Sequence, residues 1–429
     1  MNYRIEKDSM GSVEVAEDKL WGAQTQRSYD NFRIGTERMP EEMIIALARV
    51  KKAAAEVNGE EGIISREISQ AICDCADQVI SGEYRDQFPL SVWQTGSGTQ
   101  TNMNVNEVIA HLASFKLGVS VHPNDHVNCS QSTNDVFPSA IHIAAVMETE
   151  EKLLPALAGL RLSFRVLARR YRHLVKVGRT HLQDAVPLTL GQEISAYQRM
   201  MEADEKMIRQ SLDYLRPLAL GGTAVGTGLN APEDFGRKCA AILTRDTGTA
   251  FTSEKNKFYA LSSRSSLALF HGSLTALADD LMKIANDVRW LASGPRCGIG
   301  ELKIPANEPA SSIMPGKVNP TQCEAVTMVA ARVIGNNTTI NLAASQGNFE
   351  LNVYLPLLAY TVLQSIRILS DVIVSFDKHC IAGLEPDKRK IDQYMQDSLM
   401  TVTALNPHIG YDKAARVAKT AYENDISLK

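Results

Sequence analysis

The sequence predicts a mainly α-helical protein, in which an elongated bundle of long helices forms a five-helix central domain flanked by smaller helical N- and C-terminal domains. Two observations lead to this prediction. The chain has 429 residues, more than one domain usually contains. Apolar residues also recur with helical spacing over five long stretches, and in 267–291 they alternate in steps of three and four, the spacing of a coiled-coil seam.

The predicted domains follow one another along the chain. The N-terminal domain covers 1–131, the central long-helix domain 132–388, and the C-terminal domain 389–429. The N-terminal domain opens with a mixed polar stretch, and its expected helices lie near 41–58, 65–82 and 105–115. The C-terminal domain looks like the start of a small helical tail and is apparently truncated.

The five long helices are expected near 138–172, 189–215, 267–291, 321–345 and 351–376. Pro155 and Pro356 are expected to kink two of them. A narrow bundle of this length cannot bury all of its apolar faces by itself. We therefore expect a closed homo-oligomer, with a tetramer as its natural form.

Composition and charge exclude several classes of function. The net charge of −4 and the pI near 6.2 argue against nucleic-acid or anionic-membrane binding. Seven scattered cysteines, without a CxxC pair or a His/Cys cluster, predict neither a metal site nor structural disulfides, and indicate a reducing compartment. The N-terminus lacks the apolar core of a secretory signal, and no apolar run reaches the length of a membrane span. We expect a cytoplasmic protein.

Four polar segments each precede a predicted helix. One such segment is usually only a helix cap, but four in a helical chain suggest that they converge on a common anion, because hydroxyls, amides and free N–H groups bind carboxylates well. In the last of them, Asn319 fits an N-cap, Pro320 the first helical position and Gln322 a capping box. Thr189 and Gln192 are predicted to cap the helix after the third. The four segments are 95–102, 130–135, 178–184 and 310–319.

Single residues in these segments are ambiguous when each is considered alone. His181 follows Arg179 and Thr180 in a polar stretch, yet a lone histidine is more often structural. Glu324 is a first-turn acid that the helix dipole favours, unless it reaches His181 and raises the basicity of the imidazole. The glycine-rich stretch 221–228 lacks the Lys-Ser/Thr pair and preceding strand of a phosphate loop, so a flexible loop or a close backbone packing role is expected. Lys257 is expected to make a structural contact.

Taken together, these segments resemble the fumarase/aspartase superfamily and, within it, class II fumarate hydratase. The resemblance runs over nearly the whole chain, and the superfamily signature Gly-Ser-x-x-Met-x-x-Lys-x-Asn falls on 310–319. Aspartases typically have glutamine where this chain has His181, so that position favours a hydratase over an ammonia-lyase. The other matching segments are 93–104, 122–128, 130–135, 178–192, 256–258 and 404–411.

The resemblance implies a hydro-lyase, a carbon-oxygen lyase of the citric acid cycle, that adds water reversibly and in anti geometry to fumarate and gives L-malate. Ser311 would remove the proton next to a carboxylate, and Lys317 and Asn319 would stabilise the resulting aci-carboxylate. His181 with Glu324 would act on the water. Substrate carboxylates would be held by Ser97, Thr99, Ser132, Thr133, Asn134 and Thr180, and a second dicarboxylate site would comprise His122, Asn124 and Asp125.

The resemblance also implies a homotetramer whose active sites each take residues from three subunits, without metal or organic cofactor. Three departures stand out. Ala310 replaces the signature glycine at the loop hinge and is expected to hinder loop closure. Thr133 stands where many fumarases have serine, and the chain stops at Lys429, where relatives continue. The alternatives are an aspartate ammonia-lyase and a catalytically silent relative of the crystallin kind.

Overall fold

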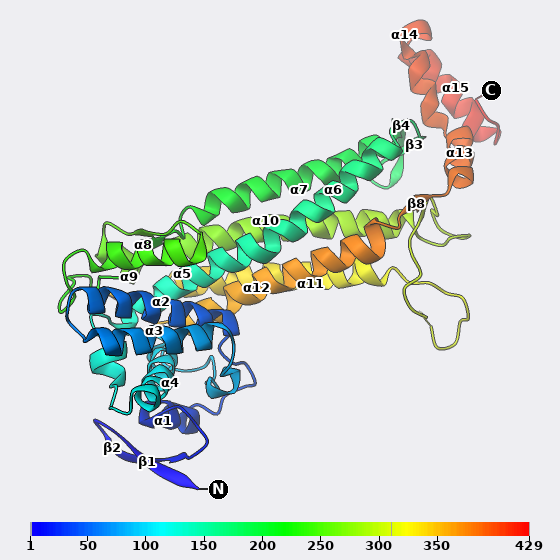
Figure 1. Cartoon of the computed structure of the whole chain (residues 1–429). Helices are drawn as coiled ribbons and strands as arrows, with labels where there is room; N and C mark the ends of the chain where they lie inside the picture. The colour runs from blue at the N-terminus through cyan, green and yellow to red at the C-terminus, as the bar shows by residue number, and fades with distance from the viewer. Residues whose placement is uncertain (1, 310, 429) are drawn as a thin grey trace. The chain divides into compact units, whose positions relative to one another are not determined.

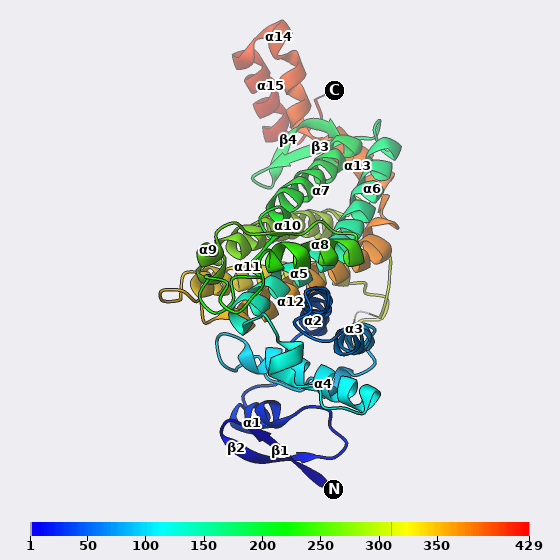
Figure 2. The same ribbon diagram turned by 60° about the vertical axis from the view of Figure 1, so that its left-hand side comes forward.

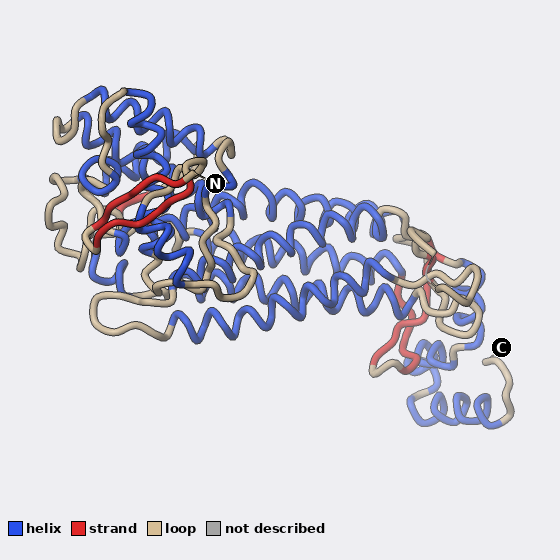
Figure 3. Tube along the Cα trace, turned by 90° about the horizontal axis from the view of Figure 1, so that it is seen from below, coloured by secondary structure: helices blue, strands red, loops and turns tan. Residues whose placement is uncertain are grey.

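The computed structural model describes residues 2–309 and 311–428, and helices dominate them (Figure 3). The predicted mainly helical fold is confirmed. The described strands form four sheets of two strands each. Ala310, the proposed loop hinge, lies outside the described residues.

The chain forms two compact units, and each combines segments that are distant in the sequence. The first unit comprises 1–153, 207–275 and 333–367, and the second comprises 154–206, 276–332 and 368–429. These units follow the packing of segments and not chain order. The predicted division into three consecutive domains therefore stays a prediction.

In the first unit, α2 (Glu41–Glu60) and α3 (Arg66–Ile80) lie side by side (Figures 1 and 2). Both occur where the apolar pattern predicted them. Ser65 caps α3, because its side chain accepts a hydrogen bond from the Ile68 amide. The unit also contains β1 (Tyr3–Asp8), β2 (Gly11–Ala16), α1 (Ala23–Asn31), α4 (Thr99–Leu117), α5 (Thr133–Glu148), β5 (Pro217–Leu218), α8 (Phe235–Thr247), β6 (Thr252–Ser253) and α9 (Lys257–Ser262).

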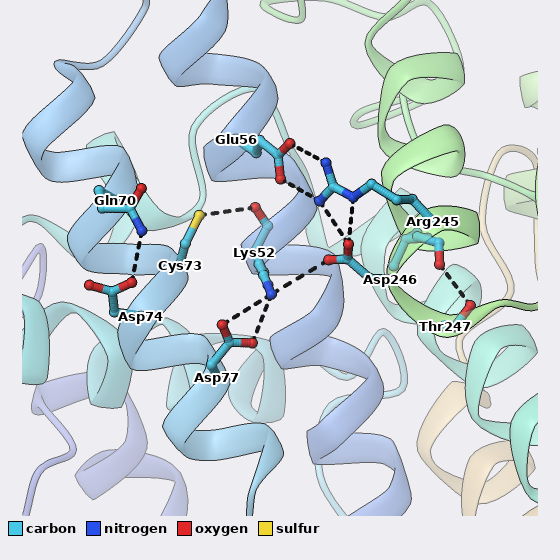
Figure 4. A network of polar contacts seen from close by, with 10 residues as sticks. Lys52, Glu56, Gln70, Cys73, Asp74, Asp77, Arg245, Asp246 and Thr247 are labelled. Carbon is cyan, nitrogen blue, oxygen red and sulfur yellow. Dashed lines mark hydrogen bonds and ion pairs between the residues drawn. The ribbon is translucent and has the colours of Figure 1, made fainter.

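Charged side chains join α2, α3 and α8 near the surface (Figure 4). Arg245 on α8 donates two hydrogen bonds to Glu56, at 2.6 and 2.8 Å. Lys52 on α2 binds Asp77 at 2.9 Å and Asp246 at 3.5 Å. Exposed ion pairs of this kind contribute little individually, roughly 0–1 kcal/mol each. They fix how the three helices align more than how stable they are.

The second unit contains α6 (Leu154–Arg170), which lies beside α7 (Leu190–Leu212) in Figure 1. Arg161 on α6 pairs with Glu205 on α7 at 3.1 Å. The Tyr197 hydroxyl on α7 donates to Asp287 on α10 (Ser265–Leu291) at 3.0 Å. The remaining elements of the unit are β3 (Val175–Thr180), β4 (Gln183–Thr189), β7 (Leu302–Lys303), β8 (Glu385–Pro386), α13 (Lys388–Asp397), α14 (Asn406–Ile409) and α15 (Tyr411–Glu423).

The long helices match the predicted stretches closely. Their final members are α11 (Thr321–Ala344) and α12 (Leu355–Phe376). The seam predicted on α10 is buried along its whole length, which confirms that apolar spacing selected the inward face. Its buried residues are Leu267, Phe270, Leu274, Leu277, Leu281, Ile284, Val288 and Leu291.

The two prolines act at helix starts. Pro356 is the second residue of α12, so it begins this helix and the predicted kink is wrong. Pro155 is likewise the second residue of α6, just after the π-helical turn Thr149–Leu153 that separates α6 from α5. The sequence had indicated one stretch over 138–172 with a kink at this proline, and the interruption lies immediately before it.

The helical stretch Leu355–Ile381 is the one among the described residues that is long and apolar enough to cross a membrane by length and composition. Most of its apolar window, 61%, is buried inside the protein. The core helix of a bundle passes the same test, because it is apolar on several faces.

Candidate active site

In the first unit, the segment 95–102 turns into α4 through a glycine that the geometry requires. Gly98 has φ of +78°, and a Cβ at this position would lie 2.3 Å from the ring of Phe137. The turn brings two hydroxyls together: Ser97 Oγ and Thr99 Oγ1 are 2.8 Å apart and hydrogen-bonded. Both side chains are partly accessible. The predicted polar helix start is thus present, with its hydroxyls side by side.

The segment 130–135 caps α5 with a reciprocal pair of hydrogen bonds, as in a capping box. Ser132 Oγ accepts from the Asn134 amide at 3.2 Å, and the Ser132 amide donates to Asp135 at 3.0 Å. Asn134 Nδ2 donates to the carbonyl of Ala224 at 2.8 Å. Thr133 Oγ1 accepts a hydrogen bond of 2.9 Å from Asn102 Nδ2 on α4. This last bond links the two polar segments of the unit directly.

Asp135 explains the glycine-rich stretch 221–228. Its buried carboxylate accepts hydrogen bonds of 2.9 Å from the amides of Gly221 and Thr223, besides the one from Ser132. Gly221 has φ of +89°, a conformation that glycine adopts without strain. The expected packing role of this stretch is confirmed. Lys257 makes the expected structural contacts, donating to the Leu218 carbonyl at 3.1 Å and to Ser253 at 2.7 Å.

The predicted second dicarboxylate site, His122 with Asn124 and Asp125, opens a one-turn π-helix, Pro123–Val127. All three side chains are exposed next to one another. His122 Nδ1 accepts from the amides of Asn124 at 3.3 Å and Asp125 at 3.1 Å, so it caps the turn. The Asp125 carboxylate lies 3.2 Å from the same nitrogen.

In the second unit, the segment 178–184 differs from its prediction. It is not a simple loop before a helix: β3 and β4 pair as an antiparallel hairpin, and His181 and Leu182 form its two-residue tip. Both tip residues have positive φ, +55° and +60°, as the favoured two-residue hairpin turn requires. The turn presents His181 and Thr180 to solvent. Alternation of valines with polar residues over 175–180 was the signal that helical spacing hid.

A cluster of buried charges anchors this hairpin. Lys176 on β3 is buried and binds Glu193 at 2.7 Å and Glu301 at 3.1 Å. Glu301 also accepts two hydrogen bonds from Arg179, at 3.1 and 2.8 Å. Lys176, Arg179 and Glu193 line a cavity of about 740 Å³ together with Thr180 and His181. The predicted cap beyond the hairpin is confirmed, since Thr189 and Gln192 bind each other's amides at 2.8 and 3.1 Å.

The loop 311–320 carries the proposed base. Ser311 Oγ accepts hydrogen bonds from the amides of Ile313 at 3.3 Å and Met314 at 2.9 Å. Gly316, with φ of +80°, turns the chain so that the exposed Lys317 follows.

The helix after this loop starts slightly later than predicted. It begins at Thr321, so Asn319 lies one residue before the capping position. Gln322 is not part of the predicted capping box, because its Oε1 accepts from Ser375 on α12 at 2.8 Å. Glu324 is exposed in the first turn of α11. In the described part of the chain, no hydrogen bond or ion pair joins Glu324 to His181.

Comparison with known proteins identifies the family. A family model described as lyase matches residues 11–335, and one described as the fumarase C C-terminus matches 402–429. Class II fumarate hydratase of Helicobacter pylori strain J99 is 57% identical, with 100% of this chain and 94% of the relative aligned. The chain belongs to the class II fumarate hydratase family. The enzyme of Bordetella parapertussis is 58% identical over the same shares of the two chains.

Solved structures agree with this membership in the class II fumarate hydratase family. The class II fumarase of Schistosoma mansoni has a TM-score of 0.97 and 42% identity, with 100% of this chain and 94% of that chain covered. A structure from Brucella melitensis titled fumarate lyase:delta crystallin, bound to cobalt, has a TM-score of 0.95 and 38% identity over the same shares. The resemblance inferred from the sequence motifs is confirmed.

Two buried charged residues that hold the polar segments of the site in place were not predicted from the sequence. Lys51 is fully buried on α2, and its Nζ donates to Asn128 Oδ1 and Gln131 Oε1, each at 2.9 Å. Burial lowers the pKa of Lys51 to about 7, against the attraction of Asp135. Glu301 is the second residue, fully buried beneath the hairpin. Lys51 lies in an apolar helical stretch and Glu301 in an irregular segment, so neither residue gave a periodic signal by which it could be found.

Proposed function

We propose that this protein is a fumarate hydratase that interconverts fumarate and L-malate by anti addition of water, a step of the citric acid cycle. The geometry of Ser311 carries the proposal. A serine acts as a base only when its alkoxide is stabilised. Its Oγ already accepts two backbone N–H groups, from Ile313 and Met314, as an oxyanion would require.

In the dehydration direction, Ser311 would take the proton from the carbon next to a carboxylate of L-malate. The electron pair left on that carbon delocalises into the carboxylate and gives an aci-carboxylate, whose added charge Lys317 and Asn319 would stabilise. The neighbouring C–O bond then breaks, and the hydroxyl leaves as water with a proton from His181, which Glu324 would orient. Hydration is the reverse sequence.

The substrate carboxylates would be held by the hydroxyl and amide groups at the starts of α4 and α5, and by Thr180. Neutral hydroxyls that already sit in a hydrogen-bonded array can turn their protons toward an anion at little cost. The exposed group His122, Asn124 and Asp125 is proposed as a second dicarboxylate site. The groups in the first set are Ser97, Thr99, Ser132, Thr133 and Asn134.

We also propose a cytoplasmic homotetramer with shared active sites. His181 and Glu324 both belong to the second unit and are not bonded in one chain, so their pairing calls for a neighbouring subunit. Exposed apolar side chains on α11, with Met328 68% and Leu342 63% accessible, favour burial against another copy. Mixing a His181→Gln protein with a Ser311→Ala protein and letting their subunits exchange should restore activity in hybrid active sites. If the mixture stays inactive after subunit exchange, the active sites are not shared between subunits.

The reaction is tested by following the ultraviolet absorbance of fumarate with L-malate and with L-aspartate as substrates. We expect fumarate to form from L-malate and to disappear when fumarate is supplied alone. Faster formation from L-aspartate would establish an ammonia-lyase instead. No turnover of either substrate would establish a catalytically silent relative.

A further inference from the structure

Lys51 is a buried cation whose hydrogen-bond partners are neutral. Its side chain is 0% exposed, and its Nζ donates to the amide oxygens of Asn128 and Gln131. Burying an ammonium group costs desolvation free energy that two neutral amide partners do not fully offset. A nearby opposite charge and a contact with the proposed site are both present.

From Lys51 a continuous hydrogen-bonded chain leads to a proposed substrate-binding hydroxyl. Asn128 Oδ1 accepts from Lys51 and also from Asn102 Nδ2 at 3.2 Å and Asn106 Nδ2 at 3.1 Å. Asn102 Nδ2 in turn donates to Thr133 Oγ1 at 2.9 Å. Since this bond occupies a lone pair of Thr133 Oγ1, the hydroxyl hydrogen is left to donate elsewhere. This series of hydrogen bonds leaves the Thr133 hydroxyl free to donate its hydrogen, and a carboxylate accepts such a hydrogen bond.

Lys51 is also attracted electrostatically by Asp135, whose carboxylate holds the neighbouring loop. Asp135 is fully buried and accepts three backbone amides, from Ser132, Gly221 and Thr223. Burial raises the pKa of Asp135, while the three amides and Lys51 oppose that rise. The attraction between Lys51 and Asp135 opposes the pKa shift that burial gives each of them, so two buried titratable groups of opposite sign lie at the polar segment 128–135.

We propose that Lys51 is a positioning residue for dicarboxylate binding, which acts through Asn128 and Asn102 to orient Thr133 and to keep positive potential behind the carboxylate-binding segments. The inference rests on the proposed fumarate hydratase activity. It adds a residue from α2, outside every sequence segment that carries the family resemblance, to the residues that recognise the substrate.

The test replaces Lys51 by methionine, which keeps an unbranched side chain, shortens it by one atom and removes the charge. Lys51→Met should raise KM for fumarate about tenfold or more, with kcat within about threefold, and should weaken binding of the unreactive dicarboxylate succinate, measured by calorimetry, by the same factor. Lys52→Met is the matched control: it removes the neighbouring ammonium from the ion pairs with Asp77 and Asp246 and should leave KM and succinate affinity unchanged.

A lysine with only a structural role would lower the unfolding temperature of Lys51→Met without changing KM, and that result would overturn the proposal. Should Lys51→Met fail to fold, Asn128→Asp serves instead, because it is isosteric, keeps all three donors on Oδ1 and cancels the charge of Lys51. It should raise KM and the succinate dissociation constant about tenfold, and unchanged values would refute the inference. A wild-type protein without fumarate hydration would instead defeat the proposed function, and succinate binding would still report on Lys51.

Discussion

Both carboxylate oxygens of Glu301 accept hydrogen bonds from Arg179, at 3.1 and 2.8 Å. Arg179 lies two residues before His181, which is at the tip of the β3–β4 hairpin. The same carboxylate binds Lys176 at 3.1 Å, and the Arg179 guanidinium lies 5.7 Å from the ring of Tyr394 on α13. A hairpin of two short strands is only marginally stable alone. The fixed position of the hairpin, and hence that of His181, therefore depends on Glu301 together with Glu193, which also binds Lys176.

Replacing Glu301 by glutamine should destabilise the protein by about 3 kcal/mol, because two buried or partly buried cations lose their shared counter-charge. Activity should fall as well, since the hairpin that carries Thr180 and His181 is no longer held. Thermal unfolding and fumarate hydration measured on the same preparation check both effects. Glu308→Gln, the same change on an exposed side chain of the second unit, should alter neither. Equal stability of the two variants would show that Glu301 is not the anchor.

Replacing Ser311 by alanine should lower kcat for fumarate hydration by about 10²–10⁴-fold, the range in which a positioned acid–base group contributes. Stability should change by no more than about 0.5 kcal/mol, since the loop is accessible. Steady-state kinetics and thermal unfolding measure the two quantities. The adjacent Ser312→Ala is the control and should retain wild-type turnover. If Ser311→Ala also does so, another residue removes the proton.

Replacing His181 by glutamine should lower hydration about 10²–10⁴-fold, because glutamine keeps hydrogen-bonding capacity but cannot exchange a proton with water. The exposed position of the side chain means that folding should be unaffected. The pH profile of any residual activity gives a second measure, since it should lose the limb that depends on imidazole ionisation. His379→Gln, at another exposed histidine of the second unit, should keep both rate and profile. An unchanged pH profile in His181→Gln would remove His181 from the proton-transfer step.

The helices could be predicted because the spacing of apolar residues along the sequence indicates which face of each helix is buried. The α10 seam from Leu267 to Leu291 is the clearest case, with every predicted position buried. The cap formed by Thr189 and Gln192 was predictable for the same reason, since the two residues interact across three positions. The cap predicted from Asn319 and Gln322 is not formed, because α11 begins at Thr321. The β3–β4 hairpin was missed because strands of six and seven residues give a weaker pattern than the long helices on either side.

The buried charged residues that hold the site segments in place could not be predicted, because each of them bonds to a partner far away in the sequence. Arg179 and Glu301 are separated by 122 residues, and Lys51 and Asn128 by 77. No local pattern requires a buried lysine on the apolar face of α2 or a buried glutamate in an irregular segment. Only the packed structure shows which distant acceptor each charge meets.

A carboxyl pair on α7 and α10 predicts how stability depends on pH. Asp204 is only 1% exposed, and burial together with the facing Asp280 and Asp279 raises its pKa to about 7. Because the folded pKa lies above the unfolded value near 3.8, the protonated carboxyl stabilises the folded state fully below about pH 4. That contribution is lost progressively as pH rises toward 7, where the folded state must carry an ionised buried acid beside other acids.

Asp204→Asn should therefore flatten this dependence, since asparagine is isosteric with the protonated acid and does not ionise. Relative to the wild type, the unfolding temperature of the variant should rise between pH 4 and pH 8, and most of the gain should appear between pH 5 and pH 7. Asp279→Asn removes an exposed carboxylate one residue from Asp280 and should give a much smaller pH-dependent gain. Parallel unfolding-temperature curves for wild type and Asp204→Asn would mean that folding does not raise the pKa of Asp204, and would refute this explanation.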